Sequence, residues 1–356
     1  MGDKNCFIQS VAGAVPDTIM DQGLADKLMT RYYEGELRPR SMDVLHKILK
    51  HPSIKQRHIS VDSHQDLSLI RNEDPDVRIE RFNRWAVELS SQATDKALQK
   101  AGKVREDIGA LIVNTCTGYV CPGIATYLIE KMGLSRSTPV YDLVGSGCGG
   151  AIPNIQLGQS LQVDDGKVVV CVSVEICSAT FQMSDDISLV LSNALFGDGA
   201  AAAVLGAASG ELKLIDSAGH FLPQFREDVR YVYRNGALHN KLSPQLPKVI
   251  REVIPPLVEE LLRRNDLSVR DIGHWAIHPG GDKMVSAIQQ ELQITDSQME
   301  STRTILRDYG NMSSPSVLFI LERELTKGIE EGQWCVMIGY GAGLSAFAYL
   351  TRKVSS

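Results

Sequence analysis

The feature that most constrains the fold of this 356-residue chain is a repeat that links two distant segments. One copy reads ALQKAGKVREDIGALIVNTCTG and the other reads LLRRNDLSVRDIGHWAIHPGG. Each contains a helical segment, the tripeptide Asp-Ile-Gly, which begins at Asp107 and at Asp271, and then an apolar strand. Seven residues after these Asp residues, the first copy has Asn114 and the second has His278.

The pattern continues downstream of both copies. After the glycine-rich turn around Cys148 come the helix-like IPNIQLGQSLQ and an apolar run that begins at Lys167. After the turn at Gly310 come SVLFILERELTKG and an apolar run that begins at Trp334. Apolar β-branched runs that alternate with helices are typical of parallel sheets with helices on both faces. Unless the shared tripeptide is a coincidence, the sequence predicts a layered α/β core of two halves related by a pseudo-twofold axis.

The two halves are expected to be residues 1–209 and 210–356, joined within the Gly/Ala/Ser-rich stretch 200–210. Such symmetry brings equivalent turns together at the centre, where strand ends and helix starts meet. Open α/β sheets bind their ligands at such places. We therefore expect one shared site between the halves.

Composition limits the ligands that such a site can take. Lys and Arg total 37 against 43 Asp and Glu, a net charge of -6, so no general attraction to nucleic acid or to an anionic membrane is expected. An anionic ligand has to be met by a local basic patch. No apolar run reaches the roughly 18 residues that a membrane helix needs. Hydrophobic residues make up 43% of the chain, which is enough for a large core.

Cysteine usage indicates reduced thiols and a cytoplasmic location. An odd number of cysteines in a long chain without a signal peptide argues against a disulfide framework. Their spacing contains no C-x-x-C pair and fits no structural zinc pattern, so we expect no metal. The seven are Cys6, Cys116, Cys121, Cys148, Cys171, Cys177 and Cys335.

Cys148 is the candidate nucleophile, because glycines surround it in DLVGSGCGGAIPNI and a helical segment follows. Glycines allow a sharp turn and a close backbone approach. A helix N-terminus carries partial positive charge, which lowers the pKa of a thiol and favours the thiolate. The alternative is a small buried cysteine at a tight turn.

His278 and Asn311 are the candidate partners of that cysteine. His278 ends an apolar strand and is followed by Pro279, Gly280 and Gly281, which leave its imidazole at a strand tip. Asn311 stands at a helix start, where the alternative role is an N-cap. Each of these residues is equivocal on its own.

Taken together, five segments resemble those of the type III polyketide synthases, the chalcone synthase-like family, and of its microbial members in particular. They are VGSGCGGAIPNIQ, SNALFGDGAAA, WAIHPGG, YGNMSSPSVLFIL and GYGAGLSAF, and the resemblance covers nearly the whole chain. It implies the thiolase fold, five αβαβα layers alternating helix and sheet, and a homodimer. It also implies coenzyme A thioesters as substrates, without a cofactor.

The resemblance places the family's catalytic residues on Cys148, His278 and Asn311. An acyl-CoA starter is then expected to acylate Cys148, which divides acyl transfer into two easier steps. Malonyl-CoA is expected to lose carbon dioxide, and His278 and Asn311 can donate to the resulting enolate oxygen. Repeated condensation and cyclisation follow.

Substrate choice in this family depends on the residues that line the cavity. Cys177, Thr180 and Cys116 fall where plant chalcone synthases usually have threonines, and Asn240 falls where they have a second gating Phe. This predicts a less polar pocket with one aromatic wall missing, an aliphatic starter, and an alkylresorcinol or alkylpyrone product. The alternative is that other side chains refill the space.

The resemblance assigns further positions to binding. Phe196 falls on the Phe that guards the entrance, Gly341 on the C-terminal glycine-rich loop, and Ser313 beside the catalytic asparagine. Cys121 falls where a partner subunit contributes to the neighbouring pocket. Lys55 and Arg57 resemble the basic stretch at the coenzyme A tunnel, where cations can hold phosphates. The residues expected to bind the substrate are Phe196, Cys116, Cys177, Thr180, Cys121, Asn240, Gly341 and Ser313.

Two other functions stay open at this point. An initiating β-ketoacyl-ACP synthase shares Cys, His and Asn on the same fold but condenses only once, using acyl carrier protein. A thiolase-fold protein that binds acyl-CoA without turnover is the second. The GCGG, HPGG and NMSSPSVLFIL contexts favour the polyketide synthase, and a binder has no need of all three polar residues.

Overall fold

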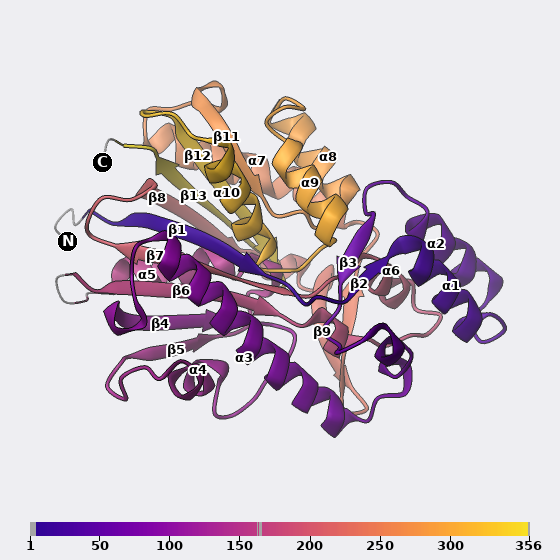
Figure 1. Cartoon of the computed structure of the whole chain (residues 1–356). Helices are drawn as coiled ribbons and strands as arrows, with labels where there is room; N and C mark the ends of the chain where they lie inside the picture. Colours follow the sequence, from indigo (N-terminus) through magenta and orange to yellow (C-terminus); the bar gives the residue numbers. More distant parts are fainter. Residues whose placement is uncertain (1–4, 162, 164–165, 355–356) are drawn as a thin grey trace.

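A computed structural model of the protein describes residues 5–161, 163 and 166–354 (Figure 1). Within these residues, nine strands form one large sheet in the order β11-β12-β13-β8-β1-β7-β6-β4-β5. The elements of the N-terminal half are β1 (Phe7–Ala14), β2 (Ile19–Asp21), α1 (Gln22–Tyr33), α2 (Pro39–Leu49), β3 (Gln56–His58), η1 (His64–Ser68), η2 (Ile70–Asn72), α3 (Pro75–Lys100), η3 (Arg105–Asp107), β4 (Ile108–Asn114), α4 (Ile124–Met132), β5 (Val140–Leu143), η4 (Gly147–Gly149), α5 (Ala151–Ser160), β6 (Val168–Glu175), η5 (Cys177–Thr180), α6 (Ile187–Leu195) and β7 (Gly199–Gly206). Those of the C-terminal half are β8 (Leu212–Phe221), η6 (Pro223–Phe225), β9 (Val229–Arg234), β10 (Ala237–Leu242), α7 (Leu246–Arg264), η7 (Val269–Asp271), β11 (Ile272–Ile277), α8 (Asp282–Glu291), α9 (Glu300–Tyr309), α10 (Ser316–Lys327), β12 (Trp334–Gly341) and β13 (Ser345–Arg352).

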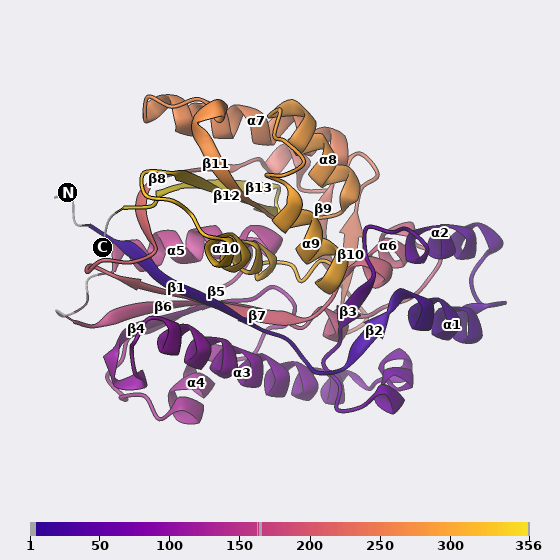
Figure 2. The ribbon, with the colours of Figure 1, turned by 45° about the horizontal axis from the view of Figure 1, so that its top comes forward.

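The elements stack in five layers, as the thiolase fold requires (Figure 2). Helices α3 and α4 cover one outer face, against the strands from β1 to β5 in the sheet order. Helices α5 and α10 form the middle layer, and α7 with α8 covers the other outer face, against β8 and β11 to β13. Strands β6 and β7 are buried along their whole length because helices pack on both of their faces.

The pairing pattern repeats between the halves. Strand β6 pairs parallel with β4 and antiparallel with β7, and β12 pairs parallel with β11 and antiparallel with β13. Strand β1 then pairs with β7, and β8 with β13. The two halves join where β1 pairs with β8 through Phe7 and Ile8.

The shared tripeptide forms the same local structure in both copies. Asp107 ends η3 and its carboxylate accepts the N–H of Val104 at 3.0 Å, while Asp271 ends η7 and accepts the N–H of Ser268 at 2.7 Å. The Ile that follows begins a strand each time. A capped turn after a long helix therefore sets the start of β4 and of β11.

One expectation about the sheet needs correction. Among the described residues it is mixed, because only β4 with β5, β4 with β6, and β11 with β12 run parallel. Short connections such as the one between β12 and β13 force antiparallel pairing. Strand β7 extends to Gly206 and β8 begins at Leu212, so the connection between them is residues 207–211, which overlaps the stretch 200–210.

Helices α1, α2 and α6 form a smaller lobe beside the layers (Figure 1). Its apolar cluster includes Met29, Leu45 and Val190. The two-stranded pair of β2 and β3 connects this lobe to the layers. In the described part of the chain, no helix is both long enough and apolar enough to span a membrane.

Candidate active site

Cys148 lies in η4, on the turn between β5 and α5. Gly147 before it has φ +54, a conformation that glycine adopts without strain. Gly341 of β12 packs directly on this turn, since a Cβ at Gly341 would come within 2.7 Å of the Cys148 nitrogen and 2.6 Å of the Gly149 nitrogen. Gly341 therefore packs closely behind the Cys148 turn, and its role in substrate binding stays a prediction.

Ser313 connects Cys148 to a buried carboxylate. The Ser313 hydroxyl oxygen lies 3.2 Å from the Cys148 sulfur and 3.3 Å from Oε1 of Glu175, so its one proton can be donated to either. Ser313 has φ +61, an uncommon conformation for a residue with a side chain. The turn before α10 thus aims a hydroxyl at the thiol at the expense of backbone strain.

His278 and Asn311 meet the same centre from the C-terminal half. The His278 ring packs edge-on against Tyr340, with 5.1 Å between the ring centroids. The Tyr340 hydroxyl accepts the N–H of Gly280 at 3.3 Å, and Nδ2 of Asn311 donates to the Gly280 carbonyl over 3.4 Å. Asn311 Oδ1 accepts the N–H of Ser313 at 2.8 Å, which fixes the direction of its amide group. The three predicted catalytic residues are thus linked through a few contacts.

The charge states differ from the prediction for Cys148. Burial raises the pKa of the Cys148 thiol to about 12, against the lowering effect of the Ser313 hydrogen bond. Burial also lowers the pKa of His278 to about 3. The expectation that the turn and the helix N-terminus by themselves favour a thiolate is wrong, because a helix terminus contributes only roughly 0.3–1 kcal/mol. Burial therefore opposes charge on each of the two groups taken alone.

Glu175, which the sequence reading missed, ends β6 and has no solvent exposure. It accepts the N–H of Cys116 at 2.9 Å, the Thr117 hydroxyl at 2.9 Å and the Ser314 hydroxyl at 2.7 Å. Burial raises its pKa, and these hydrogen bonds oppose that shift. A Glu at the end of an otherwise apolar strand was the signal that could have identified it.

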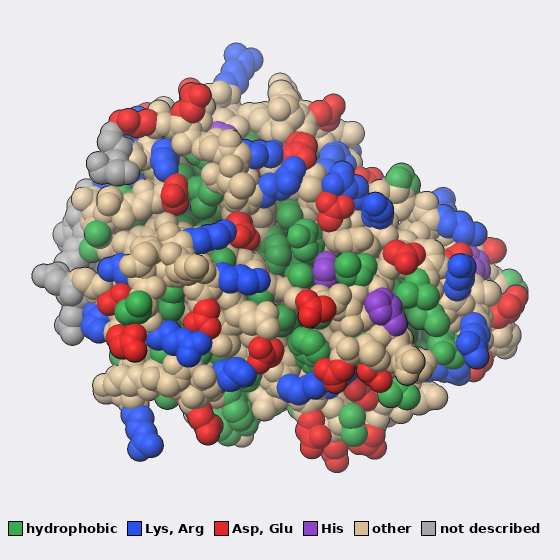
Figure 3. Space-filling model, in the orientation of Figure 1, with side chains coloured by type: hydrophobic (Ala, Val, Ile, Leu, Met, Phe, Trp, Pro, Cys, Tyr) green, Lys and Arg blue, Asp and Glu red, His purple; other side chains and the backbone are tan. Residues whose placement is uncertain are grey.

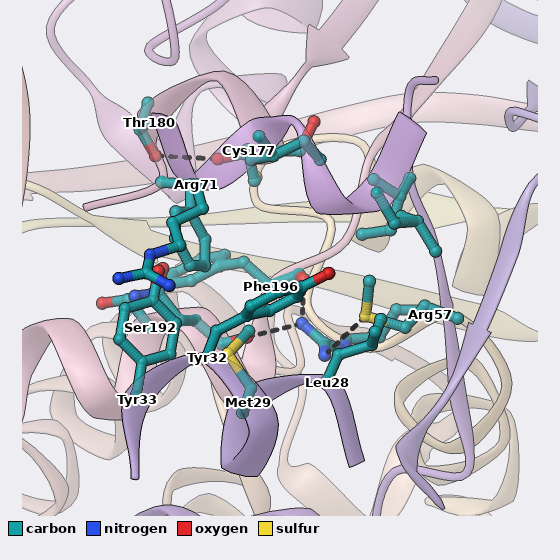
Figure 4. A pocket seen from close by; sticks show the side chains of 17 residues that line it. Leu28, Met29, Tyr32, Tyr33, Arg57, Arg71, Cys177, Thr180, Ser192 and Phe196 are labelled. Atoms are coloured by element: carbon teal, nitrogen blue, oxygen red, sulfur yellow. Dashed lines mark hydrogen bonds between the residues drawn. The ribbon is translucent and has the colours of Figure 1, made fainter. Parts of the chain in front are cut away.

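A cavity of about 60 Å³, lined in part by Phe196 and by residues of α1, lies between the layers and the smaller lobe (Figure 4). Three predicted substrate-binding residues line it: Cys177, Thr180 and Phe196. Thr180 donates its hydroxyl to the Cys177 carbonyl at 2.9 Å, and Phe196 forms a backbone bridge with Asn311. Much of the remaining wall is apolar and includes Leu28, Met29, Leu67, Ile70 and Phe181.

Cys116 and Asn240 lie elsewhere. The Cys116 thiol donates to Glu175 at 3.3 Å, so it belongs to the carboxylate cluster. Asn240 is buried on β10 and pairs with Tyr231 of β9. Tyr231 bonds to Thr180, and its pKa is raised mainly by burial and further by Cys116. Neither Asn240 nor Tyr231 is among the described residues that line the cavity, so the predicted open wall at Asn240 stays a prediction.

The two cations predicted to bind coenzyme A, Lys55 and Arg57, differ in their exposure to solvent. Lys55 is exposed, but Arg57 is 2% exposed and donates to the carbonyls of Asn193 and Phe196 at 2.7 and 2.9 Å. Arg57 braces the turn at Phe196 and is not placed to meet a phosphate at the surface. The face in Figure 3 mixes cationic and anionic side chains. Cys121 is exposed on the loop after β4.

Among the described residues, no group of three or more His, Cys, Asp or Glu side chains is arranged to hold a metal ion. The seven cysteines form no disulfide in this part of the chain. The arrangement described above offers a thiol, an imidazole, an amide and a buried carboxylate around one centre. Such a set can support acyl transfer to sulfur and stabilisation of a developing oxyanion.

Two family models together match most of the chain. Residues 3–209 match the N-terminal domain of chalcone and stilbene synthases, and residues 213–355 match the C-terminal domain. The chain is 31% identical over 309 residues to a 3,5-dihydroxyphenylacetyl-CoA synthase of Streptomyces toyocaensis, covering 83% of this chain and 79% of that protein. It is 27% identical over 354 residues to an alpha-pyrone synthesis polyketide synthase-like protein of Mycobacterium tuberculosis, covering 95% of this chain and 88% of that protein.

Solved structures agree in fold. PKS-I from the brown algae Ectocarpus siliculosus superposes with a TM-score of 0.87 at 26% identity, covering 98% of both chains. The 1,3,6,8-tetrahydroxynaphthalene synthase of Streptomyces coelicolor, a bacterial type III polyketide synthase, superposes with a TM-score of 0.88 at 23% identity, covering 98% of this chain and all of that one (100%). The second likeness supports the fold alone.

Proposed function

This chain belongs to the chalcone and stilbene synthase family and is a type III polyketide synthase, an acyltransferase that works by decarboxylative condensation; on that premise we propose that it extends an aliphatic acyl-CoA starter loaded on Cys148. The family match decides against the single-condensing synthase and the non-catalytic binder. The observation that carries the proposed starter is the apolar cavity beside Cys177 and Phe196.

Loading begins with transfer of the Cys148 proton to His278, which creates the two charges together. The sulfur attacks the acyl carbonyl, the bond to the coenzyme A sulfur breaks, and His278 returns the proton to the departing thiolate. Ser313 donates to the Cys148 sulfur while it is negative. His278 ends this step neutral, which suits its burial.

Extension requires an enolate from malonyl-CoA. When the carbon dioxide leaves, the electron pair of the broken C–C bond passes to the thioester enolate, whose oxygen becomes negative. A ring N–H of His278 and Nδ2 of Asn311 are the proposed donors to it, and one such donor is worth roughly 3–4 kcal/mol. Asn311 suits this role because its Oδ1 is held while its Nδ2 makes only a long 3.4 Å contact.

We propose an alkylpyrone or alkylresorcinol as the product. The Mycobacterium tuberculosis relative is named for alpha-pyrone synthesis, which supports this proposal. Product analysis by mass spectrometry, over a panel of starters with malonyl-CoA, tests the proposal. Octanoyl- to palmitoyl-CoA should be preferred, and a preference for coumaroyl-CoA over these would overturn the aliphatic starter.

A homodimer is proposed from the edge of the sheet. Strand β5 ends the sheet order, and three aromatic or aliphatic side chains near it are exposed: Tyr119 (74%), Tyr141 (39%) and Val144 (62%). A second copy would cover them and could bring Cys121 to the neighbouring pocket. Light scattering should give the mass of a dimer, and Tyr141→Arg should give the monomer.

Coenzyme A entry is proposed at Lys55. Its backbone N–H donates to the carbonyl of Arg307 at 2.7 Å, and Arg307 lines a groove of about 400 Å³ with His51 and Ser53. We propose Lys55 and Arg307 as the phosphate-binding cations. Lys55→Ala should raise KM for acyl-CoA with little change in kcat, and an unchanged KM would contradict this.

We propose that the chain divides into two halves, 1–209 with Cys148 and 210–356 with His278 and Asn311. We also propose a cytoplasmic location, which the absence of disulfides among the described residues supports. Cell fractionation tests the location. Separate expression of the two halves, with the condensation assay on their mixture, tests the division.

A further inference from the structure

We propose that Arg71 closes the outer end of the cavity and so limits the length of the acyl chain that Cys148 accepts. The inference rests on the proposed aliphatic starter. It adds a specificity-determining residue on a segment, η2, that lies outside the catalytic centre.

The side chains that line the cavity, Cys177, Phe196 and Arg71 among them, are labelled in Figure 4, and the wall nearer the catalytic centre is called the inner wall below. Cys177 and Phe196 form the inner wall, and both adjoin the catalytic centre. Cys177 follows Glu175 by two residues, and Phe196 forms a bridge with Asn311. An alkyl chain attached at Cys148 that passes between these two side chains therefore enters the apolar space beyond them.

The outer wall consists of α1 and the turns η1 and η2, and Arg71 holds these segments together. Its side chain pairs with Glu36, and its guanidinium lies 5.7 Å from the ring centroid of Tyr32 and 5.0 Å from that of Tyr33. Arg71 is 27% exposed and Glu36 is 54% exposed, whereas Tyr33 is 5% exposed. Arg71 thus has solvent on one side and the cavity, which it lines, on the other.

Because the cavity is small, its closure at Arg71 limits how much of an alkyl chain it can hold. Pockets that bury a whole small molecule commonly measure about 300 Å³ or more. With about 60 Å³, the closed cavity holds only a short part of an alkyl chain. A longer chain has to displace part of the wall, and the hydrophobic effect favours burying its methylene groups there.

Arg71 is the part of the wall that can give way. Partly exposed ion pairs and cation–π contacts contribute little stability. The other side of the cavity is different, because Arg57 is fully engaged with buried carbonyl groups. The chain-length limit is therefore set at Arg71 rather than at Arg57.

The test compares Arg71→Ala with Arg31→Ala. Arg31 is a matched control: its guanidinium also lies 5.7 Å from the Tyr32 ring, yet it is not among the described residues that line the cavity. Each variant is offered an equimolar mixture of hexanoyl- to stearoyl-CoA, and acylated Cys148 is measured by mass spectrometry. One methylene group in an apolar pocket is worth roughly tenfold or more in specificity. Arg71→Ala should therefore raise the palmitoyl-to-octanoyl ratio roughly tenfold or more, and Arg31→Ala should leave it unchanged.

Two further variants guard against a loss of folding at Arg71. Glu36→Gln weakens the closure and should shift the ratio in the same direction by less. Leu28→Trp fills the cavity and should shift it toward the shorter chains. If the wild type loads no aliphatic acyl group, the proposed starter and the gate both fail. If it loads them but Arg71→Ala and Arg31→Ala give equal ratios, the gate alone is overturned.

Discussion

Asn114 and His278 occupy equivalent places in the two halves, yet their surroundings differ. Both are nearly fully buried, with 4% and 1% exposure. Asn114 donates to the Ser314 hydroxyl at 2.9 Å and accepts from Asn154 at 2.9 Å and from Ser173 at 2.7 Å. His278 has a buried ring nitrogen, Nδ1, without a hydrogen-bond partner among the described residues.

This difference in hydrogen bonding indicates a structural role for Asn114 and a chemical role for His278 at equivalent positions of the repeat. A side chain whose polar atoms are each hydrogen-bonded holds its neighbours in place, and Asn114 lies against the Cys148 turn, since a Cβ at Gly150 would meet its Nδ2 at 2.7 Å. A buried polar atom without a partner is destabilising, and such atoms occur at reaction centres among other places. The first half therefore supports the Cys148 turn, and the second half carries the proposed proton-transfer group.

The largest expected effect is at the nucleophile that Asn114 supports. Cys148→Ala should abolish acyl-enzyme formation, because no other residue takes the acyl group. Intact-protein mass spectrometry after incubation with octanoyl-CoA measures it. Cys335→Ala, at a buried position on β12, serves as the control and should acylate normally. Undiminished acylation of Cys148→Ala would refute the assignment.

The comparison itself is tested by paired substitutions. His278→Ala should lower malonyl-CoA decarboxylation roughly 10²–10³-fold, the usual effect of removing one oxyanion donor. Asn114→Ala should instead reduce stability by about 1–3 kcal/mol, because the Ser173 hydroxyl loses its acceptor, whereas Nδ2 of Asn154 keeps the Val172 carbonyl at 2.8 Å. Decarboxylation per folded molecule should stay close to wild type. Carbon dioxide release and thermal melting measure the two effects, and an equal catalytic loss in both variants would remove the distinction.

A smaller effect concerns pH. Burial raises the pKa of Cys148 and lowers that of His278, and the proposed mechanism pairs the thiolate with the imidazolium that forms at the same time. His278→Gln keeps a neutral side chain at every pH and should shift the pH profile of iodoacetamide alkylation upward. At pH 7 the variant should react more slowly than the wild type. Coincident profiles would show that the two groups do not titrate as a pair.

The repeat and the resemblance singled out Cys148, His278 and Asn311 as candidates because both depend on local sequence. The capped turns at Asp107 and Asp271 lie within a few residues of the strands that they begin. The burial of Arg57 could not be predicted in this way. In sequence Arg57 resembles an exposed cation beside Lys55, but in the structure it is buried and bonds to Asn193, 136 residues away.

Asn240 and Tyr231 show the same limit. Their pairing on neighbouring strands is not apparent from the sequence around either residue. Glu175 acquires its importance from Ser313 and Ser314, which belong to the other half. Contacts between distant segments decide burial and therefore pKa, and no short motif encodes them.

The smallest expected effect lies in the repeated tripeptide, where the two glycines differ. A Cβ at Gly109 would come within 2.9 Å of Val163, whereas at Gly273 the nearest described atoms lie 4.0 Å away. Overpacking commonly costs about 1–3 kcal/mol, so Gly109→Ala should lower the melting temperature. Gly273→Ala should change stability by less than about 0.5 kcal/mol, as substitutions in open positions do. Equal melting temperatures for the two variants would mean that the Val163 side chain moves to make room for the added methyl group. The two halves would then be equivalent at this position in packing as well as in sequence.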